Sequence, residues 1–273
     1  MNLEIESCCK RKQLSFKNKE KRSGRMGNYQ ETFKRYELKY LLSDNQYQLL
    51  RQRLSDKLKI DHYGVTAICN IYFDTPEKRL IKTSLEKPIY KEKLRLRSYG
   101  TPGLEDTVFV ELKKKYKGIV YKRRERMELL KAQNYLYDGQ PLLKETQITK
   151  EINWFIMNYY NLEPSMYISY DRIAMYGMED SNLRVTFDSN ILWREEDLWL
   201  GSGPYGNAIL QPGQQLMEIK IPGTMPIWLA HILDELNIYP SSFSKYGKAF
   251  LRSIDQPHGE KKLRQFKGEK KYA

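Results

Sequence analysis

The stretch that decides the fold is "KEKLRLRSYG", residues 91–100. Its cations recur at every second position, as Lys91, Lys93, Arg95 and Arg97. Leu94 and Leu96 lie between them. Successive side chains of a β-strand point to opposite faces of the sheet. The pattern therefore predicts a strand with four cations on one face and leucines on the other.

Other segments show that this strand belongs to a larger sheet. The same alternation of a charged and an apolar face predicts strands at 33–40, 107–116, 118–129, 183–191 and 215–223. Two more strands are expected at 66–75 and 166–177, and Arg172 lies on the second. Helical patterns predict helices at 41–58 with Ser43 as N-cap, and at 130–160, 226–238 and 243–254. We expect one α+β domain of β-hairpins with covering helices.

The charged faces of these strands are mostly cationic. An antiparallel sheet with one solvated face alternates in this way too, so an open sheet is one reading. Cations on neighbouring strands repel each other, however, unless an anion of high charge density lies between them. Closing the sheet into a barrel of about eight strands would turn the charged faces inward around such a ligand. We therefore expect a closed antiparallel β-barrel that forms a cation-lined tunnel, with the helices packed outside.

Phosphate is the anion that this pattern favours, because the planar guanidinium bonds two of its oxygens at once. Only four acids interrupt the cations on the same faces: Glu37, Glu111, Asp188 and Glu218. A carboxylate among so many cations suits Mg²⁺ or Mn²⁺, which are bound by one or two carboxylates together with substrate phosphates. Glu218 is the first candidate ligand and Glu37 the second. Either could instead orient an arginine through a salt bridge.

Composition bounds the domain and its surroundings. The chain has 273 residues and a formal net charge of +13. Eight Lys or Arg and three acids fall in residues 1–30, and six and two fall in 256–273. These ranges are expected to be a basic, disordered N-terminal extension and a basic, disordered tail around a domain at 31–255. Met26 precedes the first patterned segment, so residues 1–25 could be a non-native extension.

The sequence also limits the compartment and the chemistry. The three cysteines form no C-x-x-C pair, and no apolar run is long enough to span a membrane, so we expect a cytoplasmic protein. There is no P-loop motif and no H-E-x-x-H, and the few histidines make Ser/His/Asp catalysis an unfavoured reading. Phosphoryl transfer is compatible with these absences, because it depends on positioning and charge neutralisation.

Nine short fragments of the chain resemble a known family. The fragments that carry the resemblance are R-Y-E-L-K-Y (35–40), Y-F-D-T (72–75), L-R-L-R-S-Y-G (94–100), F-V-E-L-K (109–113), Y-K-R-R (121–124), Y-D-R (170–172), L-R-V-T-F-D (183–188), M-E-I-K (217–220) and F-S-K-Y (243–246). In this order they resemble the catalytic domain of the vacuolar transporter chaperone complex, the VTC domain. That domain is a polyphosphate polymerase of the triphosphate tunnel metalloenzyme superfamily.

The resemblance implies a barrel tunnel in which the γ-phosphate of ATP joins a growing polyphosphate chain with the help of Mn²⁺ or Mg²⁺. It implies that phosphates are held by Lys39, Arg95, Arg97, Lys113, Lys122, Arg172 and Lys245, and that Glu218 binds the metal. Strand or helix phase adds Arg35, Lys93, Arg124, Arg184, Lys220 and Lys248 as substrate-binding candidates, and Glu37 as the second metal ligand.

The resemblance has departures, and alternatives stay open. The first strand of the wider superfamily often reads E-x-E-x-K, whereas Arg35 replaces the first glutamate here, as in the polymerase branch. Yeast-type members carry a sensor region and membrane helices that this sequence lacks, so a separate membrane protein could be a partner. The alternatives are a tunnel triphosphatase acting on inorganic triphosphate or nucleoside triphosphates, and a non-catalytic polyphosphate-binding module. A specific nucleic-acid partner is not expected, and the sequence does not indicate an oligomeric state.

Overall fold

A computed structural model describes residues 36–117, 119–142 and 144–255, which belong to one compact unit. The expectations for residues 1–30, Arg35 and 256–273 lie outside these ranges. Within the described part of the chain, no helix is long and apolar enough to cross a bilayer.

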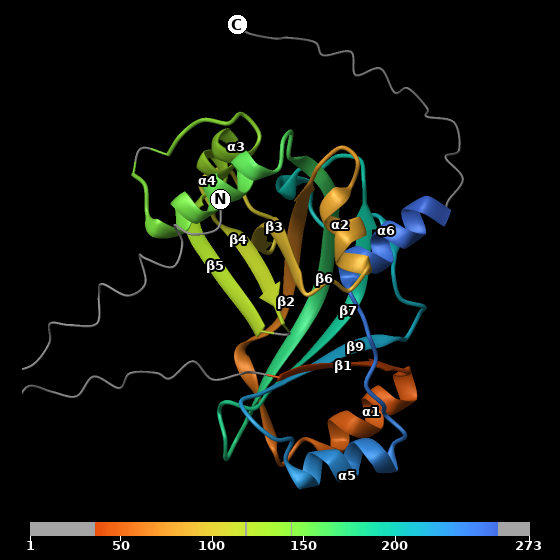
Figure 1. Ribbon diagram of the computed structural model, residues 1–273. Helices are drawn as coiled ribbons and strands as arrows, with labels where there is room; N and C mark the ends of the chain where they lie inside the picture. Colours follow the sequence, from red (N-terminus) through yellow and green to blue (C-terminus); the bar gives the residue numbers. More distant parts are fainter. Residues whose placement is uncertain (1–35, 118, 143, 256–273) are drawn as a thin grey trace, which may run out of the picture. The chain divides into compact units, whose positions relative to one another are not determined.

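The centre of this unit is one antiparallel sheet (Figure 1). Its strands are β1 (Tyr36–Leu42), β2 (Leu58–Asp74), β3 (Tyr90–Tyr99), β4 (Thr107–Tyr116), β5 (Ile119–Glu128), β6 (Glu163–Gly177), β7 (Arg184–Arg194), β8 (Asn207–Ala208) and β9 (Gln215–Ile221). They are ordered β1-β9-β7-β6-β2-β3-β4-β5, and β8 pairs with β7 outside that path. The predicted α+β class and the predicted strands are confirmed.

The sheet differs from the predicted closed barrel. Nine strands pair in an open order, and in the described residues β1 and β5 do not pair with each other. Alternation in sequence fixes which face a side chain occupies, but it does not fix whether the two edge strands meet. The backbone hydrogen bonds of the described residues therefore form an open sheet, which is the alternative considered from the sequence.

The helices are α1 (Asp44–Arg53), α2 (Arg79–Leu85), α3 (Leu129–Leu136), α4 (Gln147–Asn158), α5 (Ile227–Glu235) and α6 (Lys245–Asp255), with a 3₁₀ turn at Leu200–Ser202. Ser43 caps α1 as predicted, and a capping box with Gln46 satisfies two free donors at its start. The predicted helical segment 130–160 is two helices, α3 and α4.

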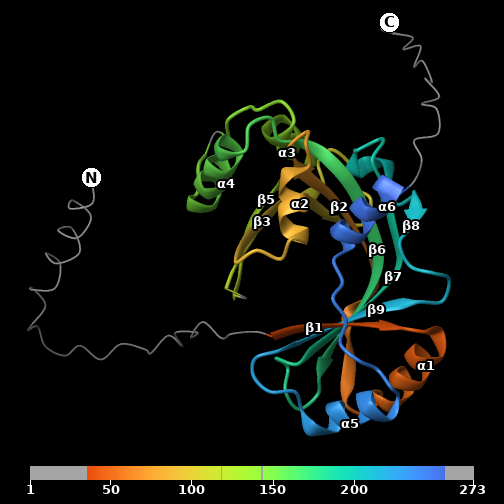
Figure 2. The same cartoon turned by 45° about the vertical axis from the view of Figure 1, so that its right-hand side comes forward.

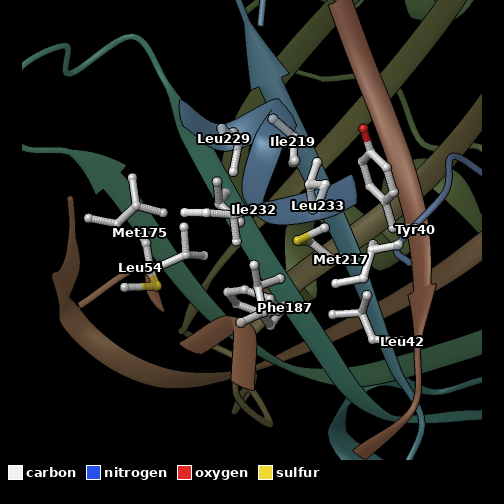
Figure 3. Close-up of a cluster of buried hydrophobic side chains, with 14 of the residues drawn as sticks. Tyr40, Leu42, Leu54, Met175, Phe187, Met217, Ile219, Leu229, Ile232 and Leu233 are labelled. Carbon is white, nitrogen blue, oxygen red and sulfur yellow. The ribbon is translucent and has the colours of Figure 1, made fainter. Parts of the chain in front are cut away.

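Two apolar cores lie on the face of the sheet that is opposite to the cations. At the end formed by β1, β9 and β7, residues such as Leu42, Phe187 and Ile219 pack against α1 and α5 (Figure 3). At the other end, Leu94 and Leu96 of β3 pack against α3 and α4. Figure 2 shows these two pairs of helices at different parts of the sheet. The expectation that apolar strand faces pack against covering helices is confirmed.

A third core lies on the same face as the cations and was not expected. Ile168 precedes Arg172 by four residues in β6, and Leu216 precedes Glu218 by two in β9, so each pair shares a face. These apolar residues pack against Phe250 and its neighbours on α6 and against α2. Helix α6 therefore covers part of the charged face and carries Lys245 to it.

Candidate active site

Strand β3 carries the predicted row of cations, and its two faces have different surroundings. Leu94 and Leu96 are fully buried in the core with α3 and α4. On the other face, cations from β3 meet those of β4 and β5, because Lys93 lies opposite Lys113 and Lys113 lies opposite Lys122. We call this surface of the sheet the cation face. The opening sequence stretch thus forms the strand and the charged row that it predicts.

The sheet curves around the cation face, so that strands near its opposite edges come close to each other. The carboxylate of Glu37 on β1 lies 4.0 Å from the ammonium of Lys113 on β4. These strands are first and seventh in the sheet order. A flat sheet would hold such strands roughly 29 Å apart at about 4.8 Å per strand. Ligands on the cation face would therefore be surrounded by side chains from both ends of the open sheet.

One buried carboxylate organises the central cations. Glu111 on β4 lies opposite Arg95 on β3 and Arg124 on β5. Its carboxylate contacts Arg95 at 2.6 Å, Arg124 at 2.5 Å and Lys122 at 2.7 Å, and only 1% of its side chain is exposed. Burial raises the pKa of Glu111, but Arg95, Arg97 and Lys122 outweigh it and hold the pKa well below its usual range. We call Arg95, Arg97, Glu111, Lys122 and Arg124 the arginine end.

Neutral partners on β2 and β6 orient Arg97, which is 6% exposed. Its guanidinium donates to the amide oxygen of Asn70 at 2.8 Å and to the hydroxyl of Tyr170 at 2.9 Å. Its Nε is 3.9 Å from Glu111. In the same way, Arg95 donates to the hydroxyl of Tyr72 at 3.1 Å. Although burial alone raises the pKa of Tyr72, nearby cations, Arg95 foremost, lower it to about 8.

A second buried carboxylate joins the sheet to α6. Asp188 on β7 is fully buried and binds Arg172 through two hydrogen bonds of 2.6 and 2.7 Å. It also contacts the ammonium of Lys245, at the start of α6, at 2.5 Å. Despite burial, Lys245 and Arg172 lower the pKa of Asp188. Asp188 thus fixes two predicted phosphate-binding cations from different elements.

Helix α6 is held in place by contacts between two motifs that are far apart in sequence. The hydroxyl of Tyr246 donates to the carboxylate of Asp74 at 2.9 Å, and the Tyr246 ring stacks on Tyr72 at 4.6 Å. The same Asp74 accepts the backbone N–H groups of Leu80 and Ile81 at the start of α2. Y-F-D-T and F-S-K-Y therefore act together: they position both α6 and its Lys245.

The other part of the β3–β4 cation row has much less compensation. Lys91, Lys93, Lys113 and Lys115 form two directly opposed pairs, and we call these four residues the lysine end. Their one ion pair within the described residues is the 4.0 Å contact between Lys113 and Glu37. Burial and repulsion from Lys91, Lys113 and Lys39 lower the pKa of Lys93 to about 8, although Tyr72 acts in the opposite direction.

Comparison with known proteins identifies the family. The chain matches the VTC domain over residues 34–253. It belongs to the VTC domain family. This confirms the resemblance seen in the sequence and places the chain in the triphosphate tunnel metalloenzyme superfamily. No curated protein gives a significant match.

Several solved structures also show similarity to this VTC domain. A protein of Bacillus halodurans, described as a candidate adenylate cyclase, is 16% identical, with a TM-score of 0.49 over 76% of this chain and 92% of its own. A Hippeastrum protein, described as a candidate adenylyl cyclase with a dominant triphosphatase activity, is 19% identical, with a TM-score of 0.49 over 80% and 95%. A Vibrio parahaemolyticus protein, also described as a candidate adenylate cyclase, is 13% identical, with a TM-score of 0.44 over 79% and 97%.

The superfamily implies a divalent metal, and the donor set of this VTC domain fits one. Glu37 and Glu218 lie on adjacent strands and the same face, since Glu37 is paired with Lys220 and Lys39 with Glu218. Burial opposes ionisation of Glu218, but Lys220 and other cations lower its pKa to about 2, so it is charged at neutral pH.

A hydroxyl beside these carboxylates also lacks a partner. Thr186 lies opposite Glu218 in the pairing of β7 with β9. Its buried hydroxyl has no hydrogen-bond partner among the described residues. Glu218 and Glu37 would hold Mn²⁺ or Mg²⁺ together with phosphate oxygens, and the Thr186 hydroxyl is free to bond the same ligands. Within the described ranges no group of three or more His, Cys, Asp or Glu residues could hold a metal alone.

The other predicted site residues differ in how close they lie to the carboxylates of Glu37 and Glu218. Lys39 is 3.3 Å from Glu37, and Lys220 is 2.6 Å from Glu218. Arg184 lies opposite Lys220 but is exposed at the start of β7. Lys248 is exposed on α6, and its side chain has no hydrogen bond or ion pair within the part of the chain that is described. Arg35 lies outside the described residues.

Sequence reasoning missed the positioning roles of Glu111 and Asp188. Both were noted as acids on the cationic faces, and both lie in fragments that carry the resemblance. Their partners come from neighbouring strands and from α6, so strand register was needed to identify them. The signal available in the sequence was a single acidic residue whose side chain falls on the same strand face as the cations.

Proposed function

We propose that this VTC domain is a polyphosphate polymerase that transfers the γ-phosphate of ATP to a growing polyphosphate chain. The observation that carries this proposal is the length of the cation row. From Lys91 to Arg97 it spans seven residues of β3, and the six steps between them cover about 20 Å at roughly 3.3 Å per step. A row of that length suits a chain of phosphates better than a single triphosphate.

In the proposed reaction, a terminal oxygen of the polyphosphate chain attacks the γ-phosphorus of ATP. The bond between that phosphorus and the β–γ bridging oxygen breaks, and ADP leaves. Arg95 and Arg97, fixed by Glu111, Asn70 and Tyr170, are oriented to bond the oxygens of the transferred phosphoryl group. A bound Mn²⁺ or Mg²⁺ would supply charge neutralisation on the phosphates.

The low pKa of one carboxylate and the ion pairs of two others favour polymerisation over hydrolysis. A terminal phosphate is already an anionic nucleophile, whereas water needs a base or a well-placed metal. Glu218, with a pKa of about 2, is a weak base at neutral pH. Glu111 and Asp188 are occupied by cations. We therefore assign Glu111 and Asp188 the role of positioning the phosphate-binding side chains.

The wider assignments belong to the same proposal. ATP and polyphosphate are the proposed ligands, and Mn²⁺ or Mg²⁺ is the proposed cofactor. We place the reaction in the cytoplasm, where ATP is available, and a separate membrane protein would be needed to carry the product across a bilayer. The proposed phosphate-binding set is the one that the resemblance implies, together with the candidates added from strand or helix phase, of which Lys248 and Arg184 are the more peripheral.

A mass balance tests the proposal. The full chain would be given ATP, a short polyphosphate primer and either Mn²⁺ or Mg²⁺, and ADP, orthophosphate and acid-precipitable chains would be measured separately. ADP matched by phosphate in long chains is the expected result. ADP matched by orthophosphate alone would show a triphosphatase. Tight polyphosphate binding without turnover under either metal would show a binding module. Either result would overturn the proposal.

A further inference from the structure

Strand β6 carries two polar side chains on the face of the sheet that is opposite to the cations. On this face Tyr167 belongs to the apolar core with α3 and α4, and Met175 belongs to the core with α1 and α5. Ser169 and Asp171 lie between them and share their face, because the side chains of a strand alternate. The proposed reaction takes place on the other face, so it does not account for these two polar residues.

Ser169 and Asp171 line a recess of about 290 Å³. Leu192 of β7 lies opposite Ser169, and Ala67 of β2 lies opposite Asp171, so the four side chains share one face of the sheet. Pro204 forms another part of the lining. Ligand pockets typically measure roughly 300–1,000 Å³, so this recess suits a ligand of only a few heavy atoms.

The wall of the recess at Pro204 is fixed by a buried arginine. The guanidinium of Arg194 donates to the carbonyl oxygens of Gly203 and Tyr205, at 3.0 Å each. It also lies over the rings of Tyr167 and Tyr205, at 3.5 and 3.9 Å from their centroids. Because Gly203 and Tyr205 flank Pro204 in the chain, these contacts form the wall before any ligand binds.

A bulge in β7 adds a third polar side chain to the recess. The pairing of β6 with β7 shifts between Ser169 and Asp171, and Asn190 lies at this shift with a φ of 48°, a left-handed conformation that asparagine tolerates. The amide N–H of Asn190 donates to one oxygen of Asp171 at 2.7 Å. The amide oxygen of Asn190 and the second oxygen of Asp171 are left as acceptors within the described residues.

The recess also contains a buried hydroxyl without a partner. Ser169 is 1% exposed, and its hydroxyl makes no hydrogen bond in the part of the chain that the structure describes. Asp171 has only the neutral Asn190 as a side-chain partner in the same ranges, although the chain carries a net charge of +13. A buried polar group without a partner is destabilising, so a ligand that bonds these oxygens is favoured.

We propose that this recess is a binding site for a small primary ammonium ion. The three N–H donors of an ammonium group match the oxygen acceptors of Asp171, Asn190 and Ser169, and the bond to the carboxylate is charge-assisted. A short aliphatic body would pack against Leu192 and Pro204. The site lies on the face opposite to the cation face and does not depend on the proposed function.

Titration of the full, isotope-labelled chain with propylammonium chloride tests this site, with backbone amide NMR signals as the readout. The expected result is a saturable shift of the signals of Ala67, Asp171 and Leu192. Two control ligands are titrated in the same way: 1-propanol, which has nearly the same size but no charge, and MgCl₂ at equal ionic strength. Neither control should produce the saturable shift.

Three variants sharpen the test. Asp171→Asn keeps an acceptor for Asn190 but removes the charge, and should bind propylammonium at least about tenfold more weakly. Ala67→Leu fills the recess without removing an acceptor and should abolish saturable binding. Asp138→Asn removes the same charge from an exposed position after α3 and should match the wild type.

Several results would overturn the site. They are a wild type without saturable shifts at these positions, the same shifts with 1-propanol or Mg²⁺, and equal affinity in the wild type and Asp171→Asn. If Asp171→Asn does not fold, Ala67→Leu decides, since binding that survives with the recess filled must take place elsewhere.

Discussion

The arginine end and the lysine end are neighbours on the same strands, yet their charges are handled in opposite ways. Arg95 is 2.6 Å from a buried carboxylate, whereas Lys93, two residues away, has no ion pair in the described part of the chain. Its ammonium donates only to the Ser244 hydroxyl, at 3.4 Å. At the arginine end, four cations share one carboxylate, which fixes them before any ligand binds. The lysine end keeps a repulsive charge that a polyanion would relieve.

This difference shows how one row of cations can perform two tasks. A reacting phosphoryl group needs donors in fixed positions, which buried hydrogen-bonded ion pairs provide at little net gain in stability. A sliding chain needs attraction without fixed geometry, which flexible lysines provide as point charges. The same contrast holds among the carboxylates. Glu111 and Asp188 are bound by guanidinium groups, whereas Glu218 and Glu37 contact only lysines and are more available to a metal.

The largest effect is expected from Glu111→Gln at the arginine end. The change leaves Arg95, Arg124 and Lys122 without their shared carboxylate, and removing one partner of a buried ion pair typically costs 3–5 kcal/mol. Because these cations are partly exposed, we expect the free energy of unfolding to fall by about 3 kcal/mol in urea titrations. Added triphosphate should stabilise the variant, since it replaces the missing negative charge.

Glu125→Gln is the matched control for that experiment. Glu125 lies on the opposite face of β5 and accepts one hydrogen bond, from the hydroxyl of Thr146. Its loss should cost about 1 kcal/mol or less. Equal destabilisation by both variants would contradict a special role for Glu111.

Glu218→Gln tests the distinction between positioning and metal-binding carboxylates. Loss of a metal ligand is expected to lower turnover about a hundredfold at limiting metal, or about 2.7 kcal/mol of transition-state stabilisation. Triphosphate binding without metal should stay the same or improve, because one negative charge leaves the site. Turnover would be measured against Mn²⁺ concentration, and binding in the presence of a chelator. A variant whose turnover keeps the wild-type dependence on metal would remove Glu218 from the metal site.

Arg97→Ala should reduce turnover at least about tenfold, or about 1.4 kcal/mol. Arg97 is buried and held by Asn70 and Tyr170, so no solvated side chain can replace it. Arg123→Ala is the control, since Arg123 lies on the opposite face of β5 in a partly exposed pair with Glu151. Initial rates of ADP release measure both. Full activity in a folded Arg97→Ala variant would show that β3 does not line the site.

The smallest effect is a pH dependence of binding to which both ends contribute, because burial lowers the pKa of Lys93 at the lysine end and of Lys122 at the arginine end to about 8. Because the pKa of Lys93 is about 8 in the free chain, this lysine loses its proton between pH 7 and 9. Bound phosphate favours the charged form and raises that pKa, so binding takes up a proton and weakens as the pH rises. Affinity for polyphosphate should fall by up to about tenfold from pH 7 to 9.

Lys93→Arg gives the control, because arginine stays protonated over this range. The variant should bind with a flatter pH dependence in titrations at constant ionic strength. Tyr72, whose pKa is also about 8, becomes an anion over the same range and acts in the same direction, so Tyr72→Phe should flatten the remaining slope. An identical pH dependence in all three proteins would contradict the assigned protonation of the lysine end.

Much of this organisation was predictable from local sequence pattern. Alternation placed the cations of β3, β4 and β5 on one face, because the side-chain period of a strand is fixed. Helix α2 was not predicted, because its cap is remote: its N-cap residue, Lys78, makes no side-chain cap bond, and Asp74 accepts the backbone N–H groups of Leu80 and Ile81. The closed barrel is not confirmed, because alternation holds no information on pairing between edge strands, and β1 and β5 do not pair in the described residues.

The sequence also predicted part of the candidate site. The sequence placed Arg95, Arg97 and Lys113 on one face with a phosphate preference, but it did not show that Glu111 binds two of its strand neighbours. Strand register decides such contacts, and register depends on tertiary packing. The placement of Lys245 beside Asp188 likewise depends on how α6 packs against the sheet, through Tyr246 and Tyr72.

The most direct test of the two-part cation face is a crystal structure of the chain with long-chain polyphosphate bound. The account predicts ordered phosphates bonded by Arg95 and Arg97 that continue along β3 and β4 toward Lys91 and Lys115. Phosphates held at the arginine end whose chain leaves in another direction, or a chain bound away from β3, would contradict it.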